Sequence, residues 1–244
     1  MGLDIYAGTL TRYYSHNWKT VVQQWAEENG YEYDRVIPND DKQGRQPSPN
    51  EIRRIVTGWS SQLVTTMSKN YKREFKAWQE DHDATPYYTD KPDWDAFMAL
   101  VLYTCGKIYN EPIPESLENH FDPSAFPILQ RAVKDKDVSM SLLKNAVCWV
   151  PIDETIFISG PMPTDVNSII GTVKGLRSEL LAINDFEWKA DEETILSWNK
   201  TEGYNTENPE AGNNTVSMAK FAFSILWRAV KFSKKNNVPI VLDF

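Results

Sequence analysis

The two ends of the chain, LDIYA (Leu3–Ala7) and VPIVLDF (Val238–Phe244), decide its fold. In the first stretch apolar residues alternate with Asp4 and Tyr6, a period of two that is typical of a half-buried strand. The second stretch is also short and apolar. Because Pro239 cannot donate a ladder hydrogen bond, this second strand should begin after it or lie at a sheet edge. A shared sheet would bury both sets of side chains and pair their backbone groups. We therefore expect both ends to join one sheet.

Helix signals fill much of the sequence between these strands. The clearest is SPNE at 48–51, which combines an N-cap serine, a proline at the first helical position and a glutamate that closes a capping box. Apolar residues then follow at helical spacing from Ile52 to Trp78, predicting one long helix or two helices joined near Gly58. Upstream, Ser15 to Gly30 indicates a shorter helix and Tyr31–Ile37 a strand.

The second half of the chain continues this mixture. Trp94–Tyr109 has few charges on any face, which predicts a central helix with Cys105 buried inside it. Because strands are expected at both ends and in the middle without a regular βαβ rhythm, we predict an α+β fold with helices packed on a small sheet. Further predicted elements are short helices at 128–134 and 139–146, a strand at 154–159, and helices capped by Thr172, by Asp191, and by Asn214 or Thr215.

Composition limits the class of protein. With 244 residues, 41% hydrophobic and 12% aromatic, the chain should fold as one domain or as two closely packed lobes. Two cysteines exclude a disulfide framework. The longest uncharged apolar run, 96–106, is about half the ~20 residues of a membrane span. Residues 1–10 carry an acid at Asp4 and no basic run, so we do not expect them to be a secretory signal. We expect a soluble protein of the cytoplasm without a membrane interaction.

Charge is unevenly distributed along the sequence. The net charge of −8 argues against a nucleic-acid partner, which requires a surplus of Lys and Arg. Pro151–Thr215 holds twelve acidic and four basic residues. Val216–Phe244, in contrast, holds one acidic and five basic residues. A basic stripe follows the capped helix and is expected to be a solvated face, because it lacks interleaved aromatic residues. Its members are Arg53, Arg54, Lys69, Lys72, Arg73 and Lys76.

Motifs of common catalytic sites are missing. His16, His82 and His120 are scattered and form no HExxH pattern, so we predict no metal site. A GxSxG nucleophile elbow is absent. The glycines and lysine of Gly171–Gly175 match neither a P-loop nor a dinucleotide-binding pattern. We expect no cofactor.

Two tyrosine-rich segments are the candidate binding residues. One ends the first strand and the other forms the loop before the central helix, and Tyr, Trp and Arg are the residue types that dominate recognition surfaces. The structural alternative is that the tyrosines cap a sheet edge while Asp93 or Asp95 supports a helix N-terminus. The candidates are Arg12, Tyr13, Tyr14, Tyr87, Tyr88, Asp90, Lys91, Asp93, Trp94 and Asp95.

Three segments carry a resemblance. MGLDIYAGTLTRYY (1–14), YYTDKPDWDAF (87–97) and VPIVLDF (238–244) together resemble a family of uncharacterised bacterial proteins. The resemblance implies a bacterial source and one compact domain, and it brings no catalytic residue. In size and charge the chain is also similar to toxin-neutralising immunity proteins of bacteria. This is a general analogy, and no motif supports it.

Two functions remain open from sequence. The first is a protein-binding module, such as an inhibitor or immunity protein, whose acidic stretch would attract a basic partner. The second is an enzyme for a small polar or anionic substrate, with Arg12 as anion clamp and Asp90, Asp93 or Asp95 as acid and base. The second requires both tyrosine-rich segments to share one cleft.

Overall fold

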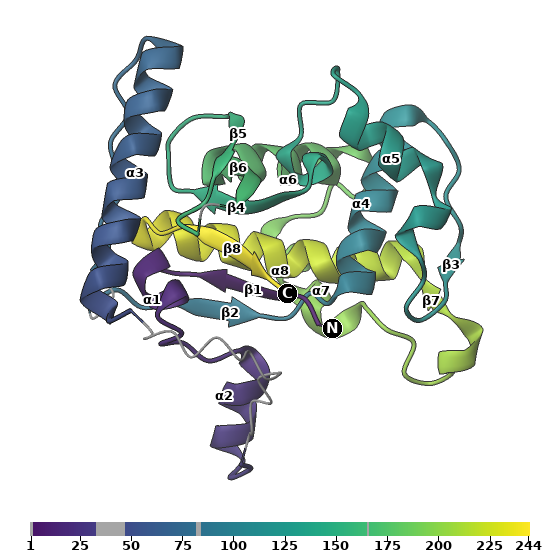
Figure 1. The fold of residues 1–244 in the computed structure, drawn as a ribbon. Helices are drawn as coiled ribbons and strands as arrows, with labels where there is room; N and C mark the ends of the chain where they lie inside the picture. The colour runs from purple at the N-terminus through teal and green to yellow at the C-terminus, as the bar shows by residue number, and fades with distance from the viewer. Residues whose placement is uncertain (1, 33–46, 82–83, 165) are drawn as a thin grey trace.

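A six-stranded mixed sheet organises the protein, whose computed structural model describes residues 2–32, 47–81, 84–164 and 166–244 (Figure 1). The strand order is β2-β1-β8-β4-β6-β5, and β4 and β6 form the parallel pair. A separate two-stranded sheet joins β3 (Ser116–Leu117) to β7 (Asn213–Asn214). The strands of the main sheet are β1 (Asp4–Ala7), β2 (Tyr88–Asp90), β4 (Ala146–Val150), β5 (Phe157–Pro161), β6 (Asn167–Thr172) and β8 (Ile240–Asp243).

The two ends of the chain are neighbours in this sheet, as predicted. β8 runs antiparallel to β1, with Asp243 opposite Asp4 and Ile240 opposite Ala7. Pro239 directly precedes β8, and its carbonyl accepts a hydrogen bond from the Gly8 amide at 3.1 Å. β8 also pairs with β4, so it is an inner strand and not an edge. The expected strand start at the proline is confirmed.

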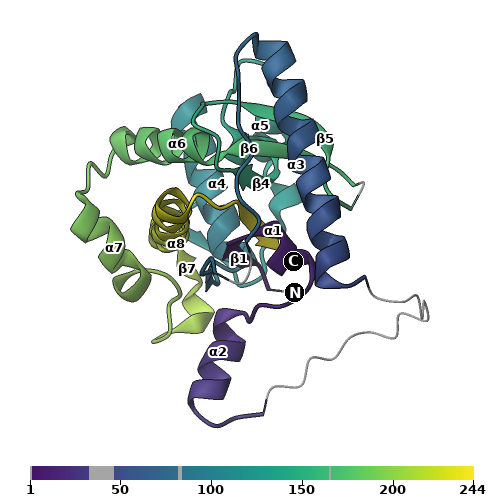
Figure 2. The ribbon, with the colours of Figure 1, turned by 90° about the vertical axis from the view of Figure 1, so that its left-hand side faces the viewer.

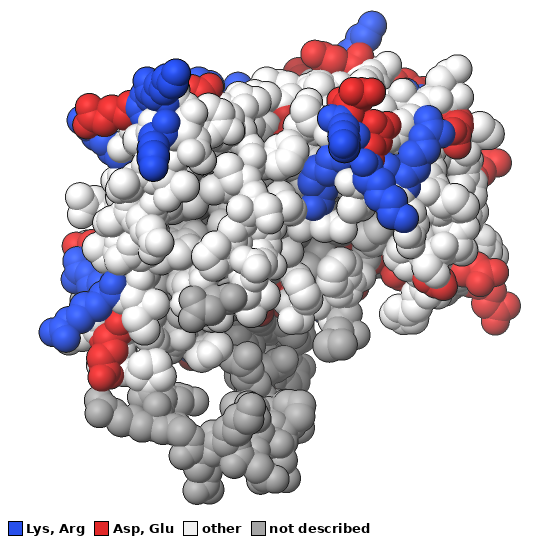
Figure 3. Space-filling view, turned by 45° about the horizontal axis from the view of Figure 1, so that its top comes forward, with Lys and Arg blue, Asp and Glu red and all other residues white. Residues whose placement is uncertain are grey.

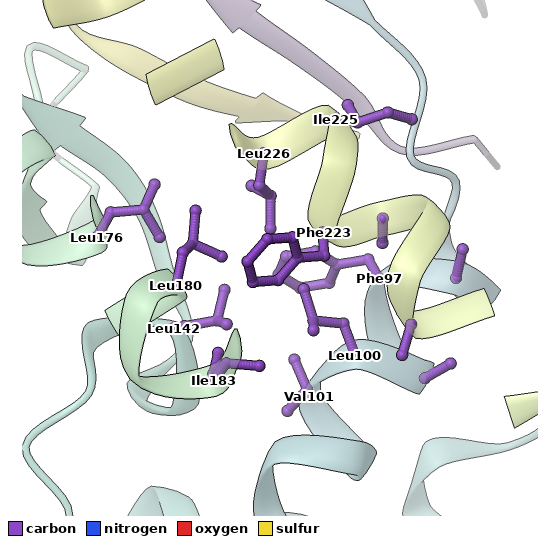
Figure 4. Close-up of a cluster of buried hydrophobic side chains, with 14 of the residues drawn as sticks. Phe97, Leu100, Val101, Leu142, Leu176, Leu180, Ile183, Phe223, Ile225 and Leu226 are labelled. Atoms are coloured by element: carbon purple, nitrogen blue, oxygen red, sulfur yellow. The ribbon is translucent and has the colours of Figure 1, made fainter. Parts of the chain in front are cut away.

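Helices cover one face of the sheet and form the larger core. Here α4 (Trp94–Tyr109) and α8 (Thr215–Asn236) pack against each other, with α6 (Val173–Phe186) and α7 (Glu192–Thr201) beside α8 (Figures 1 and 2). Figure 4 shows side chains of α4, α6 and α8 converging around Phe223. α5 (Pro127–Lys134) packs on α4. Thr172, Asp191 and Asn214 cap their helices, as the sequence predicts.

The opposite face carries α1 (Leu10–Tyr14) and α3 (Pro49–Tyr71). Ser48 and Glu51 form the predicted capping box at the start of α3. α3 passes Gly58 without a break and ends with Lys72 in the left-handed conformation. Trp78 therefore lies beyond the helix, which is shorter than its apolar pattern indicates. The second core joins α1 and α3 to the sheet through Leu10, Ile52, Val56, Leu63, Val64, Met67, Cys148, Val150, Ile170 and Val241.

The start of the first predicted helix is wrong. Ser15 ends α1, a helix absent from the sequence prediction. α2 (Val21–Glu28) begins later, because Thr20 and Gln23 form a capping box there. α2 projects away from the sheet, and Trp25 on its expected inner face is 56% exposed (Figure 1). Of the predicted strand at 31–37, all but its first two residues lie outside the described part.

Three strands in the second half of the chain, β4, β6 and β7, were not predicted from sequence. Predicted helix 139–146 is a 3₁₀ turn at Ser141–Lys144 that leads into β4. The strand predicted from Glu154 begins at Phe157, and β6 follows it as an antiparallel partner. None of the described helices is both long and apolar enough to cross a bilayer.

Candidate functional site

An aromatic cluster forms where β1 turns into α1. Thr9 caps α1 and accepts a hydrogen bond from the Arg12 amide, so the helix folds back directly after the strand. Tyr6 lies 4.9 Å from Trp18, 5.4 Å from Tyr13 and 5.9 Å from Tyr87, measured between ring centroids. The cluster thus joins the first tyrosine-rich segment to the start of the second.

Arg12 and Tyr13 hold this cluster in place. The Arg12 guanidinium lies 5.1 Å from the centroid of the Tyr87 ring and donates to the Thr85 carbonyl at 2.8 Å. The Tyr13 hydroxyl donates to Asp243 Oδ1 at 2.6 Å, and the Tyr14 ring packs edge-on against Tyr13 at 5.0 Å. The structure therefore brings the two segments together, with Arg12 beside Tyr87, the residue directly before β2.

The remaining candidates extend from that corner along β2. Asp90 lies opposite Ile5 in β1 and Tyr88 opposite Ala7, so both belong to the α8 face of the sheet. The Tyr88 hydroxyl donates to Asp90 Oδ2 at 2.7 Å. Burial, reinforced by this carboxylate, raises the pKa of Tyr88. Lys91 follows Asp90, and its charge opposes the effect of burial on the pKa of Asp4, which is raised overall.

Asp93, Trp94 and Asp95 make structural contacts at the start of α4. Asp93 Oδ1 accepts from the Trp94 amide at 2.8 Å, which caps the helix. Asp95 Oδ2 accepts from the His120 amide at 2.8 Å. The Trp94 ring lies 5.4 Å from Phe244. The contact of Asp93 matches the structural alternative of a helix N-terminus, whereas Asp95 fixes the backbone at His120.

Glu80 is a buried carboxylate that sequence reasoning missed. It accepts hydrogen bonds from the amides of Leu10 (3.3 Å) and Thr11 (2.8 Å) and from Trp78 Nε1 (2.7 Å). Burial raises its pKa, although these bonds oppose the rise. Burial also raises the pKa of the nearby Cys148 thiol to about 12. Glu80 therefore fastens the segment after α3 to the start of α1.

Metal ligands do not gather in the described part of the chain. There, no group of three or more His, Cys, Asp or Glu side chains is arranged to hold an ion. His82 lies outside the described residues.

Much of the acidic stretch is engaged internally. Glu179 is buried and accepts from the amides of Ser141 (2.7 Å) and Leu142 (3.0 Å). Because opposite charges neutralise each other locally, five further acids there contribute little to a free acidic surface. Their ion pairs are Asp153 with Lys174, Glu154 with Arg73, Glu187 with Lys107, Glu192 with Lys231 and Glu202 with Lys220.

A groove between α3 and β5 is the second candidate site. Its hollow measures about 140 Å³. At one end Trp59 Nε1 donates to the Pro161 carbonyl at 2.7 Å. Beyond the C-terminal end of α3, Arg73 forms an ion pair with Glu154. The lining is mainly apolar and comprises Trp59, Gln62, Leu63 and Thr66 of α3 with Ile158, Ser159, Gly160 and Pro161 of β5.

The register of β5 on β6 determines where the backbone groups of β5 point. The Met162 amide donates to the Val166 carbonyl at 2.9 Å, which marks a hydrogen-bonded pair at the turn of the hairpin. Bonded and non-bonded pairs alternate along an antiparallel ladder. Gly160 and Ile158, which lie opposite Ser168 and Ile170, therefore direct their backbone groups toward β6.

The same alternation turns Phe157, Ser159 and Pro161 outward. The bond from Trp59 to the Pro161 carbonyl agrees with this assignment, because this carbonyl has its partner on α3 and not on β6. β5 ends the strand order, and no strand of the described residues pairs with its outer edge. The amides and carbonyls of Phe157 and Ser159 thus lie at an open sheet edge beside an apolar groove.

Comparisons of the chain with protein-family models, curated proteins and solved structures find no match.

Proposed function

We propose that the protein is a protein-binding module that takes up an extended segment of a partner as an added strand on β5, beside α3. The observation that carries this proposal is the open edge of Phe157 and Ser159 next to the groove. In strand addition, main-chain hydrogen bonds supply affinity and adjoining pockets supply specificity. Both parts are present along β5.

The length of the groove suits a short peptide. On α3 the groove is lined from Trp59 to Thr66, which are seven positions apart. Seven helical residues span ~10 Å. An extended peptide of about three residues covers a similar distance.

The surface around β5 favours burial. Figure 3 shows an uncharged stretch between the charged side chains of α3 and those clustered on the opposite side. Ile55, one turn before Trp59, and Val166, at the end of the β5–β6 hairpin, expose 52% and 62% of their area. Covering apolar surface gains free energy, whereas covering charges would cost desolvation.

Other expectations from sequence stay predictions. The expectation of a basic partner depends on the acidic stretch, and much of that stretch forms internal ion pairs. An inhibitor or immunity role would be one use of strand addition. The enzyme alternative has Asp93 and Asp95 already bonded to backbone amides. The cytoplasm and a bacterial source remain expected.

Substitution of Ser159 tests strand addition. Peptides that bind the full-length chain would be selected from a random display library and measured against two variants. Ser159→Pro removes the outward amide and should spare the ladder to β6, because Pro161 already occupies the equivalent position. Ser159→Ala keeps the amide and serves as the matched control. We expect the proline variant to lose binding and the alanine variant to retain it.

Thermal unfolding of both variants controls for folding. The proposal is wrong if no binder is selected, or if selected peptides bind a folded Ser159→Pro variant as well as the original chain.

A further inference from the structure

We infer that the segment bound on β5 places one apolar side chain in the groove and carboxylates beside it, facing the basic end of α3. This inference rests on the proposed strand addition and names the chemistry of its ligand. It follows from the order of residues along α3. Trp59, Gln62, Thr66 and Lys69 follow one another at helical spacings of three and four, so they share one stripe. Lys69 therefore continues the groove by one turn.

The apolar part of the segment is set by the hollow. A cavity of about 150 Å³ lined by apolar side chains takes up benzene in another protein, and the hollow here is about 140 Å³. Gly160 contributes open space, since a Cβ built on it would meet no atom within 4 Å. The groove between Trp59 and Ile158 thus accommodates one aliphatic or aromatic side chain.

The prediction of carboxylates on the bound segment follows from the charge of α3 and of the residues after it. Positions 49–76 hold six basic and two acidic residues, although the whole chain has a net charge of −8. Arg73 is paired with Glu154. Lys69, Lys72 and Lys76 are exposed and make no ion pair with any described residue. Figure 3 shows Lys and Arg side chains at the upper left, together with Asp and Glu side chains, next to the uncharged stretch.

Complementary charge selects an acidic segment over other occupants. Carboxylates on the bound peptide would neutralise Lys69 and its neighbours, and attraction between opposite charges speeds association. A second copy of this chain is disfavoured. Antiparallel pairing of two β5 edges would place both basic α3 helices on the same face, where like charges repel. The ligand is therefore an apolar residue followed or preceded by Asp or Glu.

The experiment uses the peptides selected on the full-length chain. Their sequences should be enriched in Asp and Glu next to an apolar position. For the best peptide, replacing its Asp and Glu by Asn and Gln should weaken binding, and so should Lys69→Glu, each by at least about five-fold at low salt and less at high salt. Lys134→Glu, at the end of α5, is the control charge reversal and should leave affinity unchanged.

The outcomes separate the two proposals. Binding that is lost in Ser159→Pro but unchanged by Lys69→Glu and by the amide peptide would overturn the acidic ligand and leave strand addition standing. Selected peptides rich in Lys and Arg would overturn it too, in favour of the basic partner expected from net charge. Binding that survives Ser159→Pro would overturn strand addition itself, whatever the peptide's charge. Self-association lost in Ser159→Pro would identify a second copy as the occupant.

Discussion

The cysteine thiols show how burial suppresses reactivity at single residues. Cys105 is fully buried in α4, as predicted from sequence, and Cys148 is fully buried in β4. Burial raises the pKa of each thiol to about 12. At pH 8 the thiolate fraction is then on the order of one in ten thousand. We expect neither cysteine to react with a maleimide within minutes in the native state, and both to react in denaturant. Rapid native labelling, read by mass spectrometry, would contradict this burial.

Glu80 should make stability depend on pH. Burial raises its pKa, so the folded state binds more protons than the unfolded one between the unfolded value of about 4.3 and the folded value. The stabilisation of the folded state by protonated Glu80 is complete below this pH window and falls as the pH rises through it. We expect Glu80→Gln, which loses an acceptor for backbone amides, to cost ~1–3 kcal/mol near pH 4 and less near pH 7. Urea unfolding at both pH values measures this difference. A cost that grows with pH would mean that the hydrogen bonds outweigh burial.

At the scale of elements, the capping box of α3 should make a measurable contribution to the stability of the protein. Ser48 accepts from the Glu51 amide at 3.3 Å, and its own amide donates to Glu51 Oε2 at 2.7 Å. Ser48→Ala should lose ~1 kcal/mol, which lowers the melting temperature by ~2–4 °C in a chain of this size. Ser61→Ala, at an exposed position within the same helix, is the control and should change stability by less than ~0.5 kcal/mol. Equal melting temperatures for all three proteins would show that the cap contributes nothing.

Elements with local chemistry were predictable from sequence, and elements that depend on distant partners were not. Ser48, Thr172 and Asp191 cap their helices because side chain and amide are three positions apart. Ala146–Val150 is a continuous apolar run, which periodicity cannot distinguish from a buried helix segment. It is a strand because β6 and β8 pair with it. β6 itself contains Asn, Ser and Gly, which gave no strand signal.

The candidate sites also differ in how much of them could be predicted from sequence. From sequence, the meeting of the two tyrosine-rich segments was only a requirement of the enzyme alternative, and the structure shows it in the contact of Arg12 with Tyr87. A helix N-terminus was foreseen for Asp93 or Asp95, and the structure assigns the cap to Asp93, whereas Asp95 accepts from the His120 amide. The groove was not foreseeable. Trp59 and Pro161 are 102 positions apart and meet at an edge that exists only once β5 has paired with β6.

At the scale of the whole molecule, β8 connects the two halves of the sheet. It lies between β1 and β4, so deleting Val238–Phe244 would separate β2 and β1 from β4, β6 and β5. The deletion also removes Val241 from one core and Leu242 from the other. We expect an insoluble or readily proteolysed product. A truncated chain that stays soluble, monomeric and as heat-stable as the original would contradict the central role of β8.

Hydrogen exchange along β5 tests strand addition most directly. In the free protein the amides of Phe157 and Ser159 should exchange fast, because they face outward, while those of Ile158 and Gly160 should be protected by β6. Binding of a selected peptide should protect Phe157 and Ser159 and leave the other two unchanged. If Phe157 and Ser159 are already protected in the free protein, or stay unprotected when the peptide is bound, the open edge of β5 is not where this protein takes up its partner.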